Sequence, residues 1–285
     1  MKIKDVQNKF HKELDVLYGE EEVNSFFFML IEHYNNITRI QLAVNPDLVI
    51  DDYKNILSAL QLLKEQRPIQ YIIGETEFYG LSFRVNENVL IPRPETEELV
   101  EWILKDVNKN QPITILDIGT GSGCIAISLA KNLPNAEVYA LDVSAKAIKT
   151  AKRNAKLNEV ILEFIEADVL NAEEVKQNID VNFDIIVSNP PYVRVKEKAL
   201  MKPNVLDNEP HLALFVEDEN PLLFYKAISQ FATSNLNSKG QLFFEINEYL
   251  GNDMIVLLNK NDFQKIELKQ DIFKKDRMIK GIKAQ

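Results

Sequence analysis

The fold of this chain is decided by the segment LDIGTGSGC, residues 116–124, which lies between a strand pattern and a helix pattern. Residues 113–117 include three apolar residues, Ile113, Ile115 and Leu116, and predict a strand, and residues 123–131 predict a helix. The glycines fall in the turn that joins them, where they let the backbone bend sharply and approach a ligand at the start of a helix. The segment therefore predicts a ligand-binding turn in an α/β sheet.

The same alternation of strand and helix continues through most of the chain. Strands are predicted at residues 113–117, 136–142, 161–167, 183–188, 241–246, 265–269 and 277–283, and helices at 123–131, 144–157, 222–231 and 253–258. Such alternation is typical of βαβ units with a parallel sheet. The last two strands are joined by a short polar segment without a helix, so we expect them to be antiparallel. The prediction is a doubly wound, seven-stranded sheet with a reversed last strand.

The first seventy residues have a helical period instead. Two apolar stripes keep a spacing of three to four residues: Ile3, Val6, Phe10, Leu14 and Leu17, then Val23, Phe26, Phe27, Leu30, Ile31 and Tyr34. Asp51 and Asp52 predict the start of a third long helix. Its buried face would consist of Tyr53, Ile56, Leu57, Leu60 and Leu63. We expect a small all-α domain whose exposed face is available to recognise a macromolecular substrate.

A connector links the two patterns. Residues 67–71 and Gly74 interrupt the helical period, and residues 77–85 alternate about a turn at Gly80, as in a β-hairpin. Pro92 and Pro94 stiffen the chain that follows, and Thr96 or an adjacent carboxylate is expected to start the next helix. The predicted organisation is a helical domain at 1–74, a β-hairpin connector at 75–92 and an α/β domain at 93–285.

Composition excludes several classes of protein. The only cysteine, Cys124, rules out an internal disulfide and a cysteine-rich metal site, and we expect it to pack a helix. The two histidines of the amino-terminal region lack metal-ligand spacing, so no metal is expected. A formal charge of −10 disfavours stable nucleic-acid binding, which depends on basic side chains. Without a signal-peptide pattern or an apolar span, the expected location is cytoplasmic, away from membranes.

Acidic residues follow the first three predicted strands and suggest a cofactor site. Asp142, at the end of the second strand, is placed to accept hydrogen bonds from both hydroxyls of a ribose. After the third strand, Asp168 can accept from an adenine amino group, and Val169 can lie on the ring and offer its backbone N–H. Taken alone, each acid could equally cap a strand end or be a solvated charge. Their occurrence at successive strand ends favours a nucleoside-containing cofactor.

The glycine spacing does not match the dinucleotide-binding fingerprint and resembles that of S-adenosylmethionine sites. The doubly wound sheet with a reversed last strand likewise resembles the common fold of S-adenosylmethionine-dependent methyltransferases. The expected cofactor-binding residues are Asp117, Gly119, Thr120, Gly121, Ser122, Gly123, Asp142, Asp168, Val169 and Asn189.

The four residues Asn189-Pro190-Pro191-Tyr192 are the candidate catalytic segment. They follow the apolar strand 183–188, and two prolines cannot continue a strand ladder because neither donates a backbone N–H. An Asn189 oxygen and a carbonyl of the proline segment can accept the two N–H bonds of a substrate NH2 group, while Tyr192 covers its plane. The expected catalytic residues are Asn189, Pro190 and Tyr192, and Pro191 joins them in binding substrate. The alternative is a rigid turn after a buried strand.

Taken together, the motifs resemble the release-factor glutamine N5-methyltransferases of the HemK/PrmC type. The matching segments are residues 67–74, 78–80, 91–97, 116–124, 189–192, 209–214 and 276–277. The resemblance implies methyl transfer from S-adenosylmethionine to the glutamine of the Gly-Gly-Gln motif in peptide-chain release factors. The chain departs from the family where residues 215–220 and Asn247 replace expected glycines, which puts the conformation of those loops in doubt.

Two alternatives remain open at this point. The acceptor could be a glutamine of a ribosomal protein or the exocyclic amine of an RNA or DNA base, although the acidic charge speaks against a base. A cofactor-binding protein without catalysis would predict a damaged motif, and Asn189-Pro190-Pro191-Tyr192 is intact. Residues 193–219 have no clear period and suggest a lid or binding loop beside the site.

Overall fold

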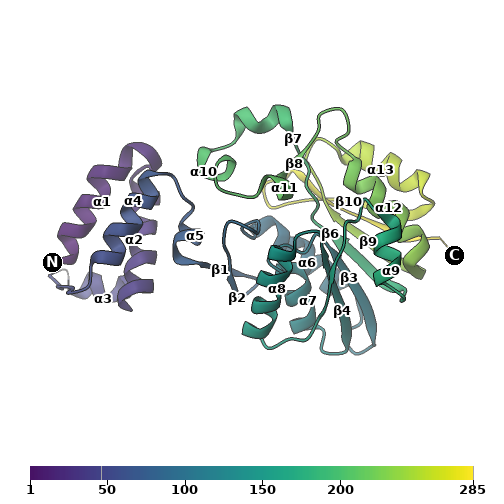
Figure 1. Cartoon of the computed structure of the whole chain (residues 1–285), viewed down its shortest axis with the longest axis horizontal. Coiled ribbons are helices and arrows are strands. Elements are labelled where there is room, and N and C mark those ends of the chain that lie inside the picture. Colours follow the sequence, from purple (N-terminus) through teal and green to yellow (C-terminus); the bar gives the residue numbers. More distant parts are fainter. Residues whose placement is uncertain (46, 285) are drawn as a thin grey trace. The chain divides into compact units, whose positions relative to one another are not determined.

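The computed structural model describes residues 1–45 and 47–284, apart from the side chains of Ala172 and Lys176. The chain forms two compact units (Figure 1). The first consists of Met1–Gly74 together with Lys202–Asn208, and the second consists of residues 75–201 and the chain from Glu209 onward.

The first unit is helical. Its helices are α1 (Ile3–Tyr18), α2 (Glu20–Asn35), α3 (Arg39–Val44), α4 (Lys54–Lys64), α5 (Ile69–Ile73) and, from the returning segment, α10 (Pro203–Leu206). Both predicted apolar stripes supply its core, which contains Phe10, Leu14, Phe27 and Leu30 without exposed surface. Leu17 was assigned wrongly, because half of its surface is exposed at the end of α1.

Two short helices before residue 75 were not predicted. The segment that interrupts the helical period contains α5, which begins after Pro68 and ends at Gly74 in a left-handed conformation (φ 80°). Proline is tolerated at a helix start, where its missing N–H has no helical partner, so Pro68 does not prevent this turn of helix. Helix α3 begins with a reciprocal capping pair between Thr38 and Gln41.

The second unit begins with the predicted hairpin. Strands β1 (Glu75–Phe78) and β2 (Leu81–Arg84) pair antiparallel. Tyr79 and Gly80 between them both have positive φ, 50° and 72°, which is the turn geometry that matches the twist of a two-residue hairpin.

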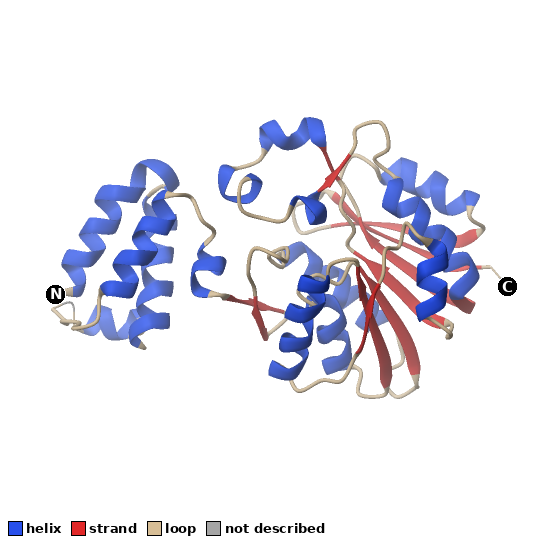
Figure 2. Ribbon diagram, in the orientation of Figure 1, coloured by secondary structure: helices blue, strands red, loops and turns tan. Residues whose placement is uncertain are grey.

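A seven-stranded sheet forms the centre of the second unit (Figure 2). Its strands are β3 (Ile113–Ile118), β4 (Ala136–Asp142), β5 (Glu163–Glu166), β6 (Phe183–Ser188), β9 (Leu236–Glu245), β10 (Phe263–Gln270) and β11 (Asp276–Lys283), in the order β10-β11-β9-β6-β3-β4-β5. Strand β11 is antiparallel to both β9 and β10, whereas the pairs from β9 to β5 are parallel. The predicted seven-stranded sheet with a reversed last strand is confirmed.

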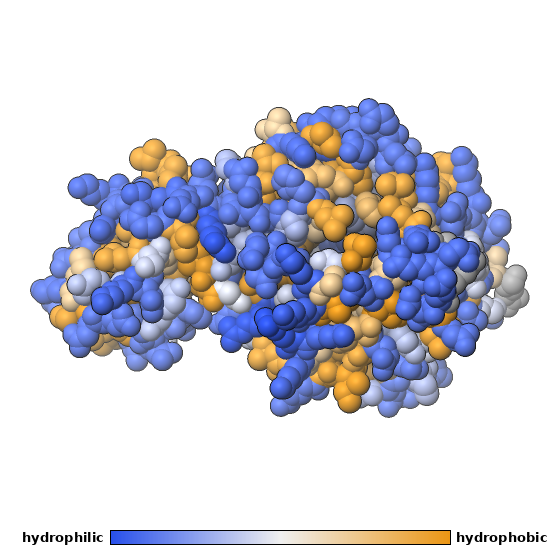
Figure 3. Space-filling model, in the orientation of Figure 1, coloured by the Kyte–Doolittle hydropathy of each residue, from blue (hydrophilic) through white to orange (hydrophobic). Residues whose placement is uncertain are grey.

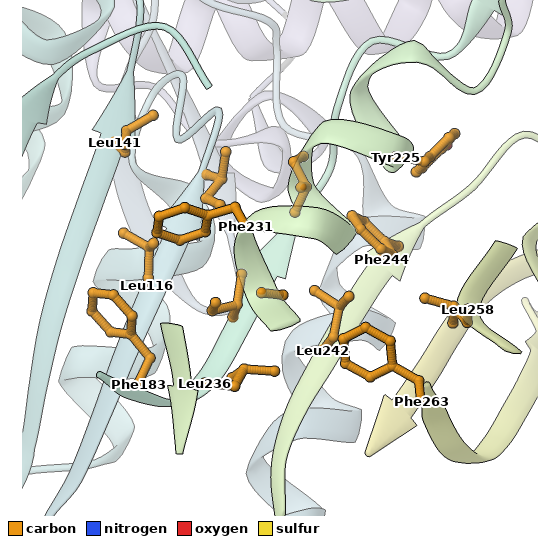
Figure 4. Close-up of a cluster of buried hydrophobic side chains, with 14 of the residues drawn as sticks. Leu116, Leu141, Phe183, Tyr225, Phe231, Leu236, Leu242, Phe244, Leu258 and Phe263 are labelled. Atoms are coloured by element: carbon orange, nitrogen blue, oxygen red, sulfur yellow. The ribbon is translucent and has the colours of Figure 1, made fainter. Parts of the chain in front are cut away.

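Helices cover both faces of the sheet. On one face, α6 (Pro94–Asp106), α7 (Cys124–Asn132) and α8 (Ala145–Leu157) pack on alternate strand residues such as Ile115 and Phe243. On the other face lie α9 (Ala172–Asn178), α12 (Leu223–Asn235) and α13 (Gly251–Lys260), packed on a core that includes Leu116, Leu242 and Phe244 (Figure 4). Burial of one apolar side chain stabilises the folded state by about 1.5–3 kcal/mol. The two helix layers therefore hold the sheet, and with it the carboxyl ends of the strands, in place.

The lack of a period in residues 193–219 led us to expect one irregular loop, but the structure differs. These residues contain β7 (Val193–Arg194), a 3₁₀ turn η1 (Val195–Leu200), α10, α11 (His211–Leu214) and β8 (Phe215–Val216). Strands β7 and β8 pair in parallel, with Val193 opposite Phe215. These elements are too short to show a period in sequence.

The surface in Figure 3 is mostly hydrophilic, with apolar side chains scattered among polar ones. Within the described part of the chain, no helix has the length and apolar character that a membrane span requires.

Candidate active site

A cavity opens at the carboxyl ends of β3, β4 and β6. It brings together eight of the residues predicted to bind cofactor or substrate: Gly119, Gly121, Asp142, Asp168, Val169, Asn189, Pro190 and Pro191. Its walls also include residues that the sequence analysis did not single out, among them Asn88, Leu90, Leu141, Pro210, Phe224 and Ile228. Leu90, Leu141, Phe224 and Ile228 are apolar, and nothing in the sequence distinguished them from core residues.

A second, smaller pocket adjoins this cavity. Asn189 and Pro190 line both spaces, and Tyr192 and Arg93 line only the smaller one. The candidate catalytic segment therefore forms a wall between two chambers.

The glycine turn has the shape that its sequence predicts. Gly119, Gly121 and Gly123 all have positive φ, at 75°, 57° and 84°. At Gly123 a side chain is also excluded by space, because a Cβ atom there would lie 2.8 Å from Ile127 Cδ1 and 3.1 Å from Ala151 Cβ. The first two glycines shape the wall of the cavity, and the third allows α7 and α8 to approach each other.

Asp117 lies behind this turn and does not line the cavity. Its Oδ2 accepts hydrogen bonds from the Thr120 hydroxyl (2.7 Å) and the Ala126 N–H (3.3 Å), while its Oδ1 is buried without a partner. Burial raises the pKa of Asp117 to about 7; those two hydrogen bonds oppose the rise and the charge of Asp142 adds to it. Thr120, Ser122 and Gly123 are likewise absent from the cavity wall.

Asp142 ends β4 and faces the turn. Its Oδ2 accepts the Gly121 N–H at 2.8 Å and its Oδ1 accepts the Ser144 N–H at 2.9 Å. Burial raises its pKa, against these backbone hydrogen bonds. Asp168 accepts the Leu170 N–H at 2.9 Å. Each carboxylate oxygen has more than one lone-pair site, so both acids can accept further hydrogen bonds from a ligand.

The Asn189 side chain is connected to a buried carboxylate. Its Nδ2 donates to Thr96 Oγ1 (3.3 Å), and the Thr96 hydroxyl donates to Glu245 Oε2 (2.6 Å). The Tyr192 hydroxyl donates to the other oxygen, Oε1, of Glu245 (2.9 Å). Residues of α6, the turn after β6 and β9 therefore form one network beside the cavity.

Glu245 is the centre of this network and is 1% exposed. Burial raises its pKa, while the hydroxyls of Thr96 and Tyr192 and the charge of Arg277 favour its ionised form. Burial, followed by the charge of Glu245, raises the pKa of Tyr192 far above its usual value. Tyr192 is therefore a neutral phenol at physiological pH.

The sequence analysis expected Thr96 or an adjacent carboxylate to start the helix, and this prediction was wrong. Arg93 occupies the position before the first helical turn, without a capping bond from its side chain, and Pro94 begins the helix. The Thr96 side chain is 2% exposed and points into the network instead. Sequence could not indicate this role, since Glu245 lies 149 positions away.

The segments that carry the family resemblance contact one another. Glu97 accepts the Tyr79 N–H at 2.8 Å, which ties the hairpin turn to α6. Glu209 accepts from Arg93 and from the Ile91 N–H, at 2.5 and 3.2 Å. Arg93 also lines the smaller pocket with Asn189 and Pro190, so the second of these contacts lies beside the turn that follows β6.

Both departures from the family motif have structural roles. Asn247 donates to the Tyr192 carbonyl and to Glu197 Oε2, both at 3.1 Å, so it joins the candidate catalytic segment to η1. Phe215 belongs to β8 and pairs with β7. The replaced glycines therefore correspond to an ordered segment in this chain.

The side chain of Cys124 has a packing role. Burial raises the pKa of the Cys124 thiol to about 12, so it remains neutral beside the sheet. Across the described residues, no group of three or more His, Cys, Asp or Glu side chains is arranged to hold a metal ion.

Comparison of the chain with a family model and with solved structures shows to which class of protein it belongs. A family model described as methyltransferase small domain matches residues 96–212. A methyltransferase from Pyrococcus furiosus shares the fold with a TM-score of 0.52, at 16% identity over 81% of this chain and 97% of that chain. A 16S rRNA N2 G1207 methyltransferase from T. thermophilus, solved with AdoMet and guanosine, gives 0.54 at 18% identity over 74% and 50% of the two chains. The fold and domain are those of methyltransferases.

Full-length relatives define the family. The release factor glutamine methyltransferase of Flavobacterium psychrophilum is 54% identical over 98% of this chain and 99% of its own length. Proteins of the same name from Bacteroides thetaiotaomicron and Streptococcus pneumoniae are 42% and 38% identical, over 93% and 98% of this chain and 95% and 98% of theirs. The chain belongs to the release factor glutamine methyltransferase family, which confirms the resemblance drawn from its motifs.

Proposed function

We propose that this protein transfers a methyl group from S-adenosylmethionine to the side-chain amide nitrogen, N5, of the glutamine in the Gly-Gly-Gln motif of peptide-chain release factors. One observation supports this above the others: full-length similarity to release factor glutamine methyltransferases coincides with an intact Asn189-Pro190-Pro191-Tyr192 wall between two chambers. The larger chamber would hold the cofactor, and the smaller one would admit the glutamine.

The residues of the larger chamber fit this cofactor. Gly119 and Gly121 have no side chains, so a ligand can approach the backbone at this wall. Asp142 retains lone pairs that can accept hydrogen bonds from two ribose hydroxyls. Asp168 and Val169 would bind the adenine edge and face, with Leu141, Phe224 and Ile228 as apolar walls. The glycine turn would be held in shape by the predicted residues that do not line the chamber, namely Asp117, Thr120, Ser122 and Gly123.

The protein's own part in the chemistry is to position a poor nucleophile. The lone pair of an amide nitrogen is delocalised into its carbonyl, and S-adenosylmethionine supplies an electrophilic methyl group on a positively charged sulfur. We assign to Asn189 Oδ1 and the Pro190 carbonyl the two N–H bonds of the substrate amide, so that the nitrogen lies in line with that methyl.

These two acceptors would also stabilise positive charge that develops on nitrogen, and Tyr192 would cover the amide plane. A bond forms between nitrogen and the methyl carbon, the carbon–sulfur bond breaks with its electron pair left on sulfur, and one N–H proton is released to solvent.

The helical unit is assigned a separate task, the recognition of the release factor. All residues that line the two chambers belong to the second unit, so the first contributes none of the groups assigned to the chemistry. An acidic chain, with a formal charge of −10, disfavours a nucleic-acid substrate held by its phosphates.

A methyl-transfer assay with three acceptors tests the proposal. The protein is incubated with labelled S-adenosylmethionine and, in separate reactions, a purified release factor, ribosomal proteins or RNA. Transfer to the release factor alone is expected. Transfer to ribosomal protein or RNA in its place would move the substrate to another amide or base amine, and transfer to none of them would contradict the enzymatic assignment.

A further inference from the structure

We propose that Glu245 and Thr96 are positioning residues that fix the orientation of the Asn189 amide, so that its oxygen faces the substrate. This inference rests on the proposed function, since it concerns how Asn189 meets a substrate NH2 group. It assigns a task to two buried polar side chains that lie outside the four-residue catalytic segment.

An asparagine amide has two ends of nearly equal size and opposite chemistry. Its oxygen accepts hydrogen bonds and its NH2 group donates them. Only the oxygen can accept from a substrate NH2, and a flipped Asn189 would place two donor groups against each other. Catalysis at this residue therefore requires that one of two similar orientations be strongly preferred.

The network supplies that preference through the single proton of Thr96. An ionised carboxylate only accepts, so the Thr96 hydroxyl must donate to Glu245 Oε2, at 2.6 Å. Thr96 Oγ1 is then an acceptor on its remaining side, where Asn189 Nδ2 lies 3.3 Å away. The NH2 end of Asn189 is thereby directed to Thr96, and Oδ1 has no hydrogen-bond partner among the described residues.

Burial makes this relay effective. Thr96 and Glu245 are 2% and 1% exposed, so water does not compete for their hydrogen bonds. Burial is the largest influence on Glu245 and raises its pKa, whereas the two hydroxyl donors and the charge of Arg277 act in the opposite direction and favour its carboxylate form. The same carboxylate accepts from Tyr192 at 2.9 Å, so one group orients both side chains that would contact the substrate amide.

The fold explains why this carboxylate can reach the site. Strand β9 lies beside β6 in the sheet, and Phe244 is the register partner of Ser188. Glu245 and Asn189 each follow that pair by one residue, so they lie at adjacent carboxyl ends. Thr96 enters from the first turn of α6 and fills the space between them.

Threonine variants test the relay with little change in volume. Thr96→Val removes the hydroxyl and keeps the branched shape, and Thr96→Ser keeps the hydroxyl. We expect kcat of Thr96→Val to fall roughly tenfold to hundredfold, with cofactor affinity by calorimetry unchanged within about threefold. Thr96→Ser should retain kcat within about threefold. Thr150→Val is the matched control, since Thr150 is also a buried helical threonine, but its hydroxyl bonds the Lys146 carbonyl and the Asn86 side chain, neither of which belongs to the network around Glu245.

A spectroscopic measurement separates orientation from activity. In protein labelled with ¹⁵N-asparagine, the Asn189 side-chain NH2 signals are compared in wild type, Thr96→Val and Thr96→Ser. We expect a change in Thr96→Val and little in Thr96→Ser. Glu245→Gln, which keeps the shape of the carboxylate, should shift the same signals and lower kcat, and it serves if Thr96→Val does not fold.

The outcomes distinguish the two proposals. An active wild type whose Thr96→Val variant retains full kcat and unchanged Asn189 signals would overturn the relay and leave the proposed function intact. If the wild type transfers no methyl group to a release factor, the proposed function fails, and the NH2 signals alone decide whether Thr96 orients Asn189.

Discussion

At the scale of single residues, Asn189 combines a predicted chemistry with an environment that sequence does not show. Its position after an apolar strand and before two prolines was sufficient to predict an acceptor at a strand end. The link through Thr96 to Glu245 was not predictable, because it joins residues 93 and 149 positions apart. The local sequence pattern indicates Asn189 as an acceptor, whereas only the fold shows which side chains contact it.

Removal of the Asn189 amide should affect chemistry more than cofactor binding. For Asn189→Ala we expect kcat to fall by roughly 10²–10³, the typical loss when one preorganised polar group at a reacting centre is removed. The Kd for S-adenosylhomocysteine, measured by calorimetry, should change less than about fivefold, a smaller effect because Asp142, Asp168 and the glycine turn would remain. Near-normal turnover in this variant would remove Asn189 from the mechanism.

At the scale of elements, the sequence predicts the regular strands and helices best where their patterns are long. Strands β4 and β6 coincide with residues 136–142 and 183–188 as predicted. Short helices were missed. Helices α3, α5 and α9 each span fewer residues than two helical turns, so their sequences show no clear period. The placement of β11 between β9 and β10 was also not predicted, since strand order is a property of the packed sheet.

Helix α8 has a second task that its apolar pattern hides. Asn154 is fully buried and accepts the Arg84 N–H at 2.7 Å, while its Nδ2 donates to the Arg84 carbonyl and to the Ser122 carbonyl at 2.9 and 2.8 Å. One side chain thus ties the hairpin to the glycine turn.

We expect Asn154→Ala to lower the free energy of unfolding by about 2–4 kcal/mol, because it leaves three backbone groups without their partner. Urea denaturation followed by circular dichroism measures the change. Asn178→Ala is the control, since Asn178 is exposed and donates only within its own helix; it should cost less than about 1 kcal/mol. Equal losses in the two variants would contradict the anchoring role of Asn154.

At the scale of the whole molecule, the chemistry and its electrostatics are concentrated in the second unit. Asp117 and Glu245 are buried in this unit, and we expect the burial of such acids to affect stability. Composition predicted a net negative chain, but the burial of individual acids could not be read from it.

Asp117 should make the protein without cofactor less stable as pH rises. Its pKa is about 7 in the folded state, against about 3.9 in unfolded chains. Between about pH 4 and pH 7 the folded state therefore binds more protons at this group, so its contribution to the free energy of unfolding decreases as pH increases.

Asp117→Asn removes this titration while it keeps an oxygen for Thr120 and Ala126. Denaturation from pH 5 to pH 8 should show that the stability of the variant relative to wild type increases with pH. A constant difference between the two proteins across this range would show that Asp117 does not titrate there.

The most direct measurement of the central claim is mass spectrometry of a release factor after incubation with this protein and S-adenosylmethionine. The proposed function predicts a gain of one CH2 group on the peptide that contains the Gly-Gly-Gln motif, with fragment ions that place it on the glutamine side chain. A substrate with Gln→Ala at that position should gain nothing. A methyl group on any other residue, or the same gain in the Gln→Ala substrate, would contradict the assignment of glutamine N5 as the acceptor.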